Sequence, residues 1–149
     1  MNDKFFMDSN ILIYTFDSHA PRKQEKAREL VATALKTQKG IISFQVVQEF
    51  LNVATRKFET PLTEAEAEKY INQVLTPLCE VFSNMELYIK AVKIMERWQY
   101  SFYDSLIIAA ALQAECEILY TEDLQDGQLI ESTLTIKNPF LISVNENKK

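Results

Sequence analysis

The sequence predicts an α/β fold, a three-layer α/β/α arrangement in which a mostly parallel sheet of four or five strands lies between helices. Short apolar segments alternate with longer helical stretches, and strands separated by helices form parallel sheets covered on both faces. The 149 residues are 47% hydrophobic and include only two glycines and four prolines, which is typical of an ordered globular protein. No repeat or linker interrupts the chain, so residues 1–149 are expected to form one domain, with a core at about residues 4–143.

Local signals predict the elements of the first third of the chain. Residues 4–7 are an apolar run that suits a buried strand. Residues 21–36 begin with a proline and continue as a charged, alanine-rich stretch, which predicts a helix. Residues 41–42 predict a second strand. Ser43 is then expected to cap a helix that runs to about Arg56.

The middle of the chain predicts one more helix and a third strand. Thr63 and Glu66 have the spacing of a capping box, in which each residue bonds the backbone of the other. The helix that they open is expected to end at about Thr76, because Pro77 follows. Residues 80–82 predict the third strand.

Two helices and two strands are expected in the last part of the chain. The first helix begins after Ser83 or Asn84 and ends near Trp98. The second covers about residues 104–114, and it is apolar nearly all round, as is typical of a helix buried against a sheet. The two strands are predicted at residues 117–120 and 139–143.

The net charge of −5 weighs against a protein that binds nucleic acid over a broad basic face. It does not exclude a nuclease, because clustered carboxylates of a site count toward the total. Three basic groups are present: Arg22, Lys23, Lys26 and Arg28; Arg56 and Lys57; and Lys90, Lys93 and Arg97.

Cysteine usage and hydropathy indicate a cytoplasmic protein without a membrane partner. Cys79 and Cys116 are isolated and are interpreted as buried free thiols in a reducing compartment. The longest apolar run, residues 106–112, is far too short for a membrane span, and no secretory signal is visible at the start of the sequence.

Four carboxylates stand at the ends of apolar segments or within them. Asp8 and Asp123 follow predicted strands, and the carboxyl ends of parallel strands meet at one edge of a sheet, where ligands bind. Asp104 lies at the start of the buried helix, where free backbone N–H groups tolerate negative charge. The sequence therefore predicts that these three side chains meet.

The fourth carboxylate, Glu49, lies in the middle of a predicted helix. It shares a helical face with Val46 and Val53, and an unpaired charge against apolar surface carries a large desolvation cost. A hard divalent cation such as Mg²⁺ or Mn²⁺ is the natural counterion for such a group of oxygens.

Each acid also has an ordinary interpretation when it is taken alone. Asp104 can cap its helix, Asp123 can belong to a turn, and Asp8 can cap a short helix together with Ser9 and Asn10. The placement of all four at one predicted site favours metal binding over these separate roles.

Other nucleotide or phosphate sites lack their residues here. The only glycines are Gly40 and Gly127, too few for a glycine-rich phosphate loop, and position 10 is asparagine where a haloacid-dehalogenase-type phosphatase needs a second aspartate. His19, the only histidine, follows a polar segment and is predicted at the surface.

Five segments resemble the PIN domain, and more closely the toxin ribonucleases of the VapC type. They are residues 6–14, 43–50, 101–110, 119–124 and, as the closing strand of the family, 136–140. The resemblance implies that Asp8, Glu49, Asp104 and Asp123 bind Mg²⁺ or Mn²⁺. It also implies that Asn10 and Thr121 support the site, that Ser9 stands where the family often has threonine, and that Asp126 is an additional nearby carboxylate.

The same resemblance implies a metal-dependent endoribonuclease that acts as the toxin of a toxin–antitoxin pair. The expected partners are RNA, a small antitoxin protein and a second copy of the chain. Two alternatives remain open at this point. One is a non-catalytic PIN-like module that binds RNA or protein, and the other is a DNA-directed nuclease or a phosphatase that uses the same acids.

Overall fold

The computed structural model describes residues 2–141 and contains a six-stranded sheet. The strand order is β3-β2-β1-β4-β6-β5, and every pairing is parallel except that of β5 with β6. The strands are β1 (Phe5–Met7), β2 (Gly40–Ser43), β3 (Cys79–Val81), β4 (Ile118–Tyr120), β5 (Leu129–Ile130) and β6 (Leu134–Lys137). The predicted α/β class and mostly parallel sheet are confirmed, whereas the predicted number of strands is too low.

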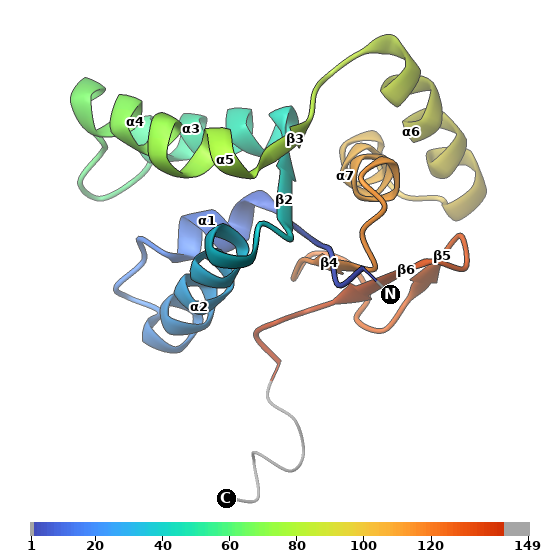
Figure 1. The fold of residues 1–149 in the computed structure, drawn as a ribbon, viewed down its shortest axis with the longest axis horizontal. Helices are drawn as coiled ribbons and strands as arrows, with labels where there is room; N and C mark the ends of the chain where they lie inside the picture. Colours follow the sequence, from blue (N-terminus) through green and yellow to red (C-terminus); the bar gives the residue numbers. More distant parts are fainter. Residues whose placement is uncertain (1, 142–149) are drawn as a thin grey trace, which may run out of the picture.

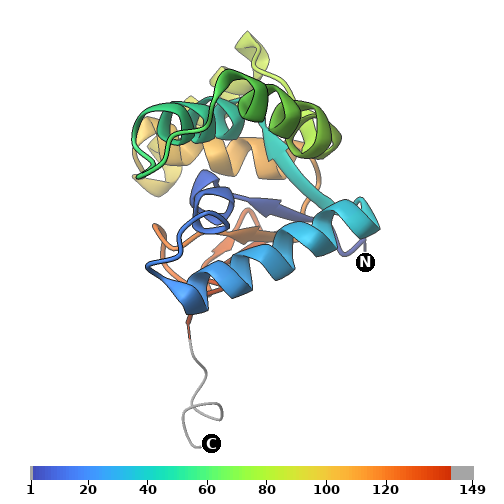
Figure 2. The same ribbon diagram turned by 90° about the vertical axis from the view of Figure 1, so that its left-hand side faces the viewer.

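Helices cover both faces of the sheet, so the predicted three layers are confirmed. Helices α1 (Ser9–Tyr14) and α2 (Pro21–Thr37) lie on one side, and α6 (Met85–Trp98) and α7 (Phe102–Gln113) lie on the other (Figure 1). Between β2 and β3 the chain forms a further group of helices, which lies beside β3 in Figure 1 and is drawn in teal and green in the upper part of Figure 2. That group comprises α3 (Phe44–Arg56), α4 (Glu64–Tyr70), the π-helical turn η1 (Ile71–Leu75) and α5 (Thr76–Leu78).

Most helix starts agree with the capping signals of the sequence. The Ser43 hydroxyl accepts a bond from the Val46 N–H at the start of α3, and Asn84 rather than Ser83 caps α6. Both bonds of the capping box between Thr63 and Glu66 are present at the start of α4.

Two predicted boundaries are wrong. The helix that Thr63 opens is expected to stop at about Thr76, but it continues to Leu78. Pro77 occupies the first turn of α5, where its missing N–H is not needed. The last strand is not at residues 139–143. Pro139 and Phe140 form a turn, in which the Phe140 N–H donates to Asn138 Oδ1, and β6 ends before it. Residues 142 and 143 lie outside the described residues.

The core is built from the strands and from the face of each helix that meets them. Phe6, Ile41 and Leu119 on the three central strands are completely buried, and α7 buries a continuous run from Ser105 to Ala111. Gly40 permits the close approach of α2 to β2, because a Cβ at this position would lie 2.1 Å from the Cβ of Ala34. None of the helices in residues 2–141 combines the length and apolarity needed to cross a bilayer.

The central strand pair positions the candidate site. Met7 and Tyr120, the last residues of β1 and β4, are register partners, and the Asp8 N–H donates to the Tyr120 carbonyl at 3.1 Å. The residues that follow both strands therefore emerge side by side at the carboxyl edge of the sheet.

Candidate metal centre

Asp8 is the most buried of the four predicted acids. It caps α1, and its Oδ1 accepts the Ser9 N–H at 2.7 Å while its Oδ2 accepts the Thr121 hydroxyl at 2.9 Å. The pKa of this carboxyl is raised to about 6, chiefly because the group is buried; the two bonds lower the pKa, and the charges of Glu49 and Asp123 add to the rise. Asp8 therefore does cap a helix, as one interpretation of the sequence proposed. This role still leaves its desolvated carboxylate near those of Glu49 and Asp123.

Glu49 projects from the middle of α3 toward the start of α1. Its Oε1 accepts the Ser9 hydroxyl at 3.1 Å, and its Oε2 accepts the amide of Gln45 at 3.3 Å. The same Ser9 hydroxyl lies 3.4 Å from Asp8 Oδ1, so one side chain bridges the two acids.

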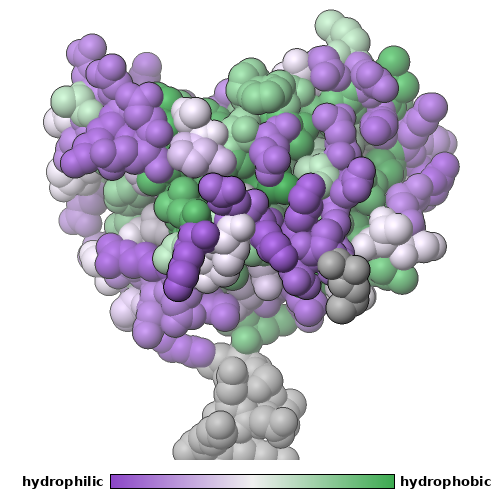
Figure 3. All heavy atoms as spheres, in the orientation of Figure 1, coloured by the Kyte–Doolittle hydropathy of each residue, from purple (hydrophilic) through white to green (hydrophobic). Residues whose placement is uncertain are grey.

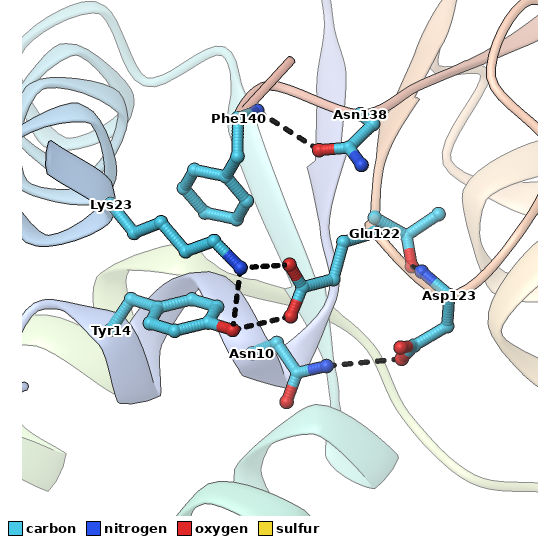
Figure 4. Close-up of polar contacts among 8 residues, drawn as sticks. Asn10, Tyr14, Lys23, Glu122, Asp123, Asn138 and Phe140 are labelled. Atoms are coloured by element: carbon cyan, nitrogen blue, oxygen red, sulfur yellow. Dashed lines mark hydrogen bonds and ion pairs between the residues drawn. The ribbon is translucent and has the colours of Figure 1, made fainter. Parts of the chain in front are cut away.

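Asp123 follows β4 and lies opposite α1. Asn10 donates its amide to Asp123 Oδ2 at 3.0 Å, and the Asp123 N–H donates to the Thr121 hydroxyl at 3.1 Å (Figure 4). Partial burial raises the pKa of Asp123, and the charges of Glu122 and Asp104 add to this shift.

Asp104 lies in the first turn of α7, but it does not cap the helix. The cap is Ser101, whose hydroxyl accepts the Asp104 N–H at 3.1 Å. Across residues 2–141, the Asp104 carboxylate has neither a hydrogen-bond donor nor an ion-pair partner. Because its charge acts on the pKa of Asp123, it belongs to the same acidic region.

Asp126 has a different local environment from the four acids. Its Oδ1 accepts the Asn138 N–H at 2.7 Å, which joins the turn after β4 to the end of β6. Within the described chain its carboxylate has no bond to the other acids. Its predicted part in the metal site stays a prediction.

No basic side chain in residues 2–141 neutralises the four carboxylates, because the ion pairs of this part of the chain all involve other acids. No three carboxylate, thiol or imidazole groups of the same residues lie close enough to enclose one ion. Mg²⁺ does not need such a cage, since it keeps several waters and is held by one or two carboxylates. The groups that could bind an ion here are carboxylates, whose oxygen atoms are hard ligands, and one of them is desolvated. They therefore fit a partly hydrated Mg²⁺ or Mn²⁺.

The structure adds two groups that the sequence reasoning missed. Gln45 contacts Glu49 from one helical turn away, and the spacing of four residues is the signal that predicts such a pair. Glu122 accepts the Tyr14 hydroxyl at 2.5 Å and the Lys23 ammonium at 2.9 Å, and Lys23 lies over the ring of Phe140 (Figure 4). These contacts of Glu122 hold the segment after β4, which includes Asp123, against α1 and α2.

The fold and the site together define a class: an α/β domain with an uncompensated acidic site at the carboxyl edge of its parallel sheet. The PIN domain family model matches residues 5–125, and the chain belongs to the PIN domain family. A search of the curated proteins gives no match.

Three solved structures share this fold over most of the chain. A toxin–antitoxin complex from Klebsiella pneumoniae superposes with a TM-score of 0.64 at 19% identity, over 93% of this chain and 100% of that one. FitAB bound to a DNA fragment gives 0.65 at 15% identity, over 93% and 97%. VapC20 from Mycobacterium tuberculosis, a toxin that cleaves the sarcin-ricin loop, gives 0.56 at 18% identity, over 80% and 90%.

Proposed function

We propose that the protein is a metal-dependent endoribonuclease. One observation carries the proposal: the buried Asp8 carboxylate, with its pKa raised to about 6, lies near two other acids without a basic partner in the described chain. The cap of α1 explains Asp8 alone, but it does not explain why the other acids lie near a desolvated carboxylate, and such a group suits a cation.

The chemistry follows from the charges of the substrate and the site. A phosphodiester is an anion, and four carboxylates by themselves repel it. A bound Mg²⁺ or Mn²⁺ supplies the positive charge that attracts the phosphate and lowers the pKa of a coordinated water. Asp8, Asp104 and Asp123 would hold the ion, directly or through water, and Glu49 would hold it or orient the attacking water. The products expected are a 5′-phosphate and a 3′-hydroxyl end.

RNA is the substrate that the comparisons favour, because VapC20 cleaves an RNA loop. We further propose that the chain acts in the cytoplasm and is the toxin of a toxin–antitoxin pair. The toxin role is supported by two of the similar structures, of which one is a toxin–antitoxin complex and the other a toxin. An arginine of an antitoxin, placed among the four carboxylates, would form charge-assisted bonds and exclude the metal.

A second copy of the chain is the other proposed partner. Met85, Ile89 and Val92 form an exposed apolar stripe on α6, and Phe44 and Phe82 pack against each other with both rings exposed. Apolar side chains are visible in the upper part of the face shown in Figure 3, which is otherwise mostly hydrophilic. Exposed apolar patches mark interaction sites.

Metal-dependent cleavage tests the proposed function. The purified protein is incubated with a panel of structured RNAs and matching DNAs in Mn²⁺, in EDTA, and as the Asp104→Asn variant, whose folding is checked by circular dichroism. We expect RNA to be cut only by the unaltered protein with metal. Intact RNA throughout the panel would overturn the proposal in favour of a binding module, and preferential cleavage of DNA would favour a DNA-directed enzyme.

A further inference from the structure

Gln45 is a buried polar residue in the first turn of α3, only 7% exposed. Its amide nitrogen, Nε2, lies 3.3 Å from Glu49 Oε2 and 3.2 Å from the Tyr103 carbonyl oxygen. Tyr103 immediately precedes Asp104 in the first turn of α7. The Gln45 amide thus links the carboxylate of Glu49, one predicted metal ligand, to the backbone beside Asp104, another predicted ligand.

The other end of the same amide has no partner within residues 2–141. Gln45 Oε1 is fully buried and accepts no hydrogen bond from this part of the chain. A buried carbonyl oxygen without a donor destabilises a fold, whereas an apolar side chain of similar length would avoid this cost. Stability alone therefore does not explain a glutamine here, and the contacts of its Nε2 group do.

A neutral donor also suits the electrostatics of the site. A lysine or arginine at this position would neutralise Glu49 and compete with a bound cation for the same oxygens. An amide donates hydrogen bonds but carries no net charge, so it can orient a carboxylate and leave its charge available.

We infer that Gln45 is a positioning residue of the candidate metal centre. It turns the Glu49 carboxylate toward Asp8 and fixes the distance between α3 and the first turn of α7, which carries Asp104. This inference rests on the proposed function, because it assumes that these acids bind a divalent cation. Residues that orient metal ligands commonly change metal affinity about 10- to 100-fold when they are replaced.

The test compares Gln45→Leu and Gln45→Met with the unaltered protein by titration with Mn²⁺ alone, followed by calorimetry, and by the melting temperature in EDTA. We expect both variants to bind Mn²⁺ about tenfold more weakly or worse, with a melting temperature equal to or above that of the unaltered protein. Ser105→Ala is the matched control, because the Ser105 hydroxyl is also buried and, among the described residues, has no partner and donates to no acid. This control should bind Mn²⁺ normally.

A double variant separates positioning from a general effect on the fold. If Gln45 acts through Glu49, Gln45→Leu should weaken Mn²⁺ binding much less in a Glu49→Gln background than in the unaltered protein. Full-strength Mn²⁺ binding by both single variants would overturn the inference while the proposed function stands. Absence of Mn²⁺ binding by the unaltered protein would overturn both, and equal losses in the two backgrounds would show that Gln45 does not act through Glu49.

Discussion

The Ser9 hydroxyl donates to Glu49 Oε1 at 3.1 Å and thereby joins the start of α1 to the middle of α3. Asp8 Oδ1 lies 3.4 Å from the same hydroxyl, so the Ser9 side chain stands between the two carboxylates and contacts both. The bond also defines which way Glu49 points.

Removal of the Ser9 hydroxyl should weaken metal binding. In Ser9→Ala the Glu49 carboxylate loses one of its two donors, and we expect about a tenfold loss of Mn²⁺ affinity, measured by calorimetry. Ser9→Thr keeps the hydroxyl and should retain most of the affinity. An alanine variant that binds Mn²⁺ like the threonine variant would contradict a role for this bond.

Asp8→Asn should stabilise the protein in the absence of metal at pH 7. The folded pKa of Asp8, about 6, is above its ordinary value of 3.8, so the contribution of this group to stability is complete below pH 4 and is lost as the pH rises through 6. The unaltered protein thereby loses about 3 kcal/mol of unfolding free energy, whereas Asp8→Asn has no carboxyl at this position and does not lose it. Urea denaturation in EDTA at pH 4, 5, 6 and 7 measures it.

The control for this prediction is Asp3→Asn, which changes an exposed carboxylate. Its unfolding free energy should follow that of the unaltered protein at every pH. Parallel pH curves for Asp8→Asn and the unaltered protein would show that Asp8 is not desolvated in solution. Asp8→Asn should also lose any increase in melting temperature that Mn²⁺ gives the unaltered protein.

Tyr14→Phe should lower the free energy of unfolding, because it removes a contact between α1 and the segment after β4. The Tyr14 hydroxyl donates to Glu122, next to Asp123, and its loss should cost about 1 kcal/mol in urea denaturation. Tyr103→Phe is a suitable comparison, because Tyr103 is 67% exposed and should lose nothing measurable. Equal stability of the two variants would mean that the Tyr14 bond contributes little.

Arg22 and Lys26 are expected to contact the RNA backbone. They are exposed one turn apart on α2 and line a cleft with Phe140, beside the Lys23–Glu122 pair. The double variant Arg22→Glu, Lys26→Glu should raise KM severalfold and reduce its salt dependence, with little change in kcat. Lys36→Glu, at the other end of α2, should behave as the unaltered protein. An unchanged KM in the double variant would exclude this cleft from binding.

Ile89→Asp should convert a dimer into a monomer. Ile89 lies in the centre of the apolar stripe of α6 and is 57% exposed, so a charge there opposes burial against a second copy. Light scattering after gel filtration gives the mass, and Lys93→Gln on the same helix should leave it unchanged. A monomeric unaltered protein would contradict the proposed homodimer.

Local signals in the sequence determined most helices and the central strands. Proline at the start of α2, Ser43 before α3 and the capping box of α4 act within a few residues, so their effects can be predicted without the rest of the chain. The short β5 and the placement of β6 were missed, because a strand of two residues has little pattern of its own and forms by pairing with a neighbour.

The sequence also singled out the four acids as candidates, because a carboxylate against an apolar segment is unusual wherever it occurs; their part in metal binding stays a prediction. Gln45 was within reach of the same reasoning, since it lies four residues before Glu49 on one helical face. The contacts of Glu122 were not, because Tyr14 and Lys23 approach it from helices far away in the sequence.

The sequence by itself determined the α/β class, the helix boundaries near strong caps, and which acids are candidates for a metal. Only the tertiary structure decided that Ser9 bridges Asp8 and Glu49, that Ser101 rather than Asp104 caps α7, and that no basic residue in the described chain offsets the acids. The physical reason is the range of the interactions. Capping and helical periodicity act between neighbours in the chain, whereas desolvation and charge repulsion depend on every segment that the fold brings together.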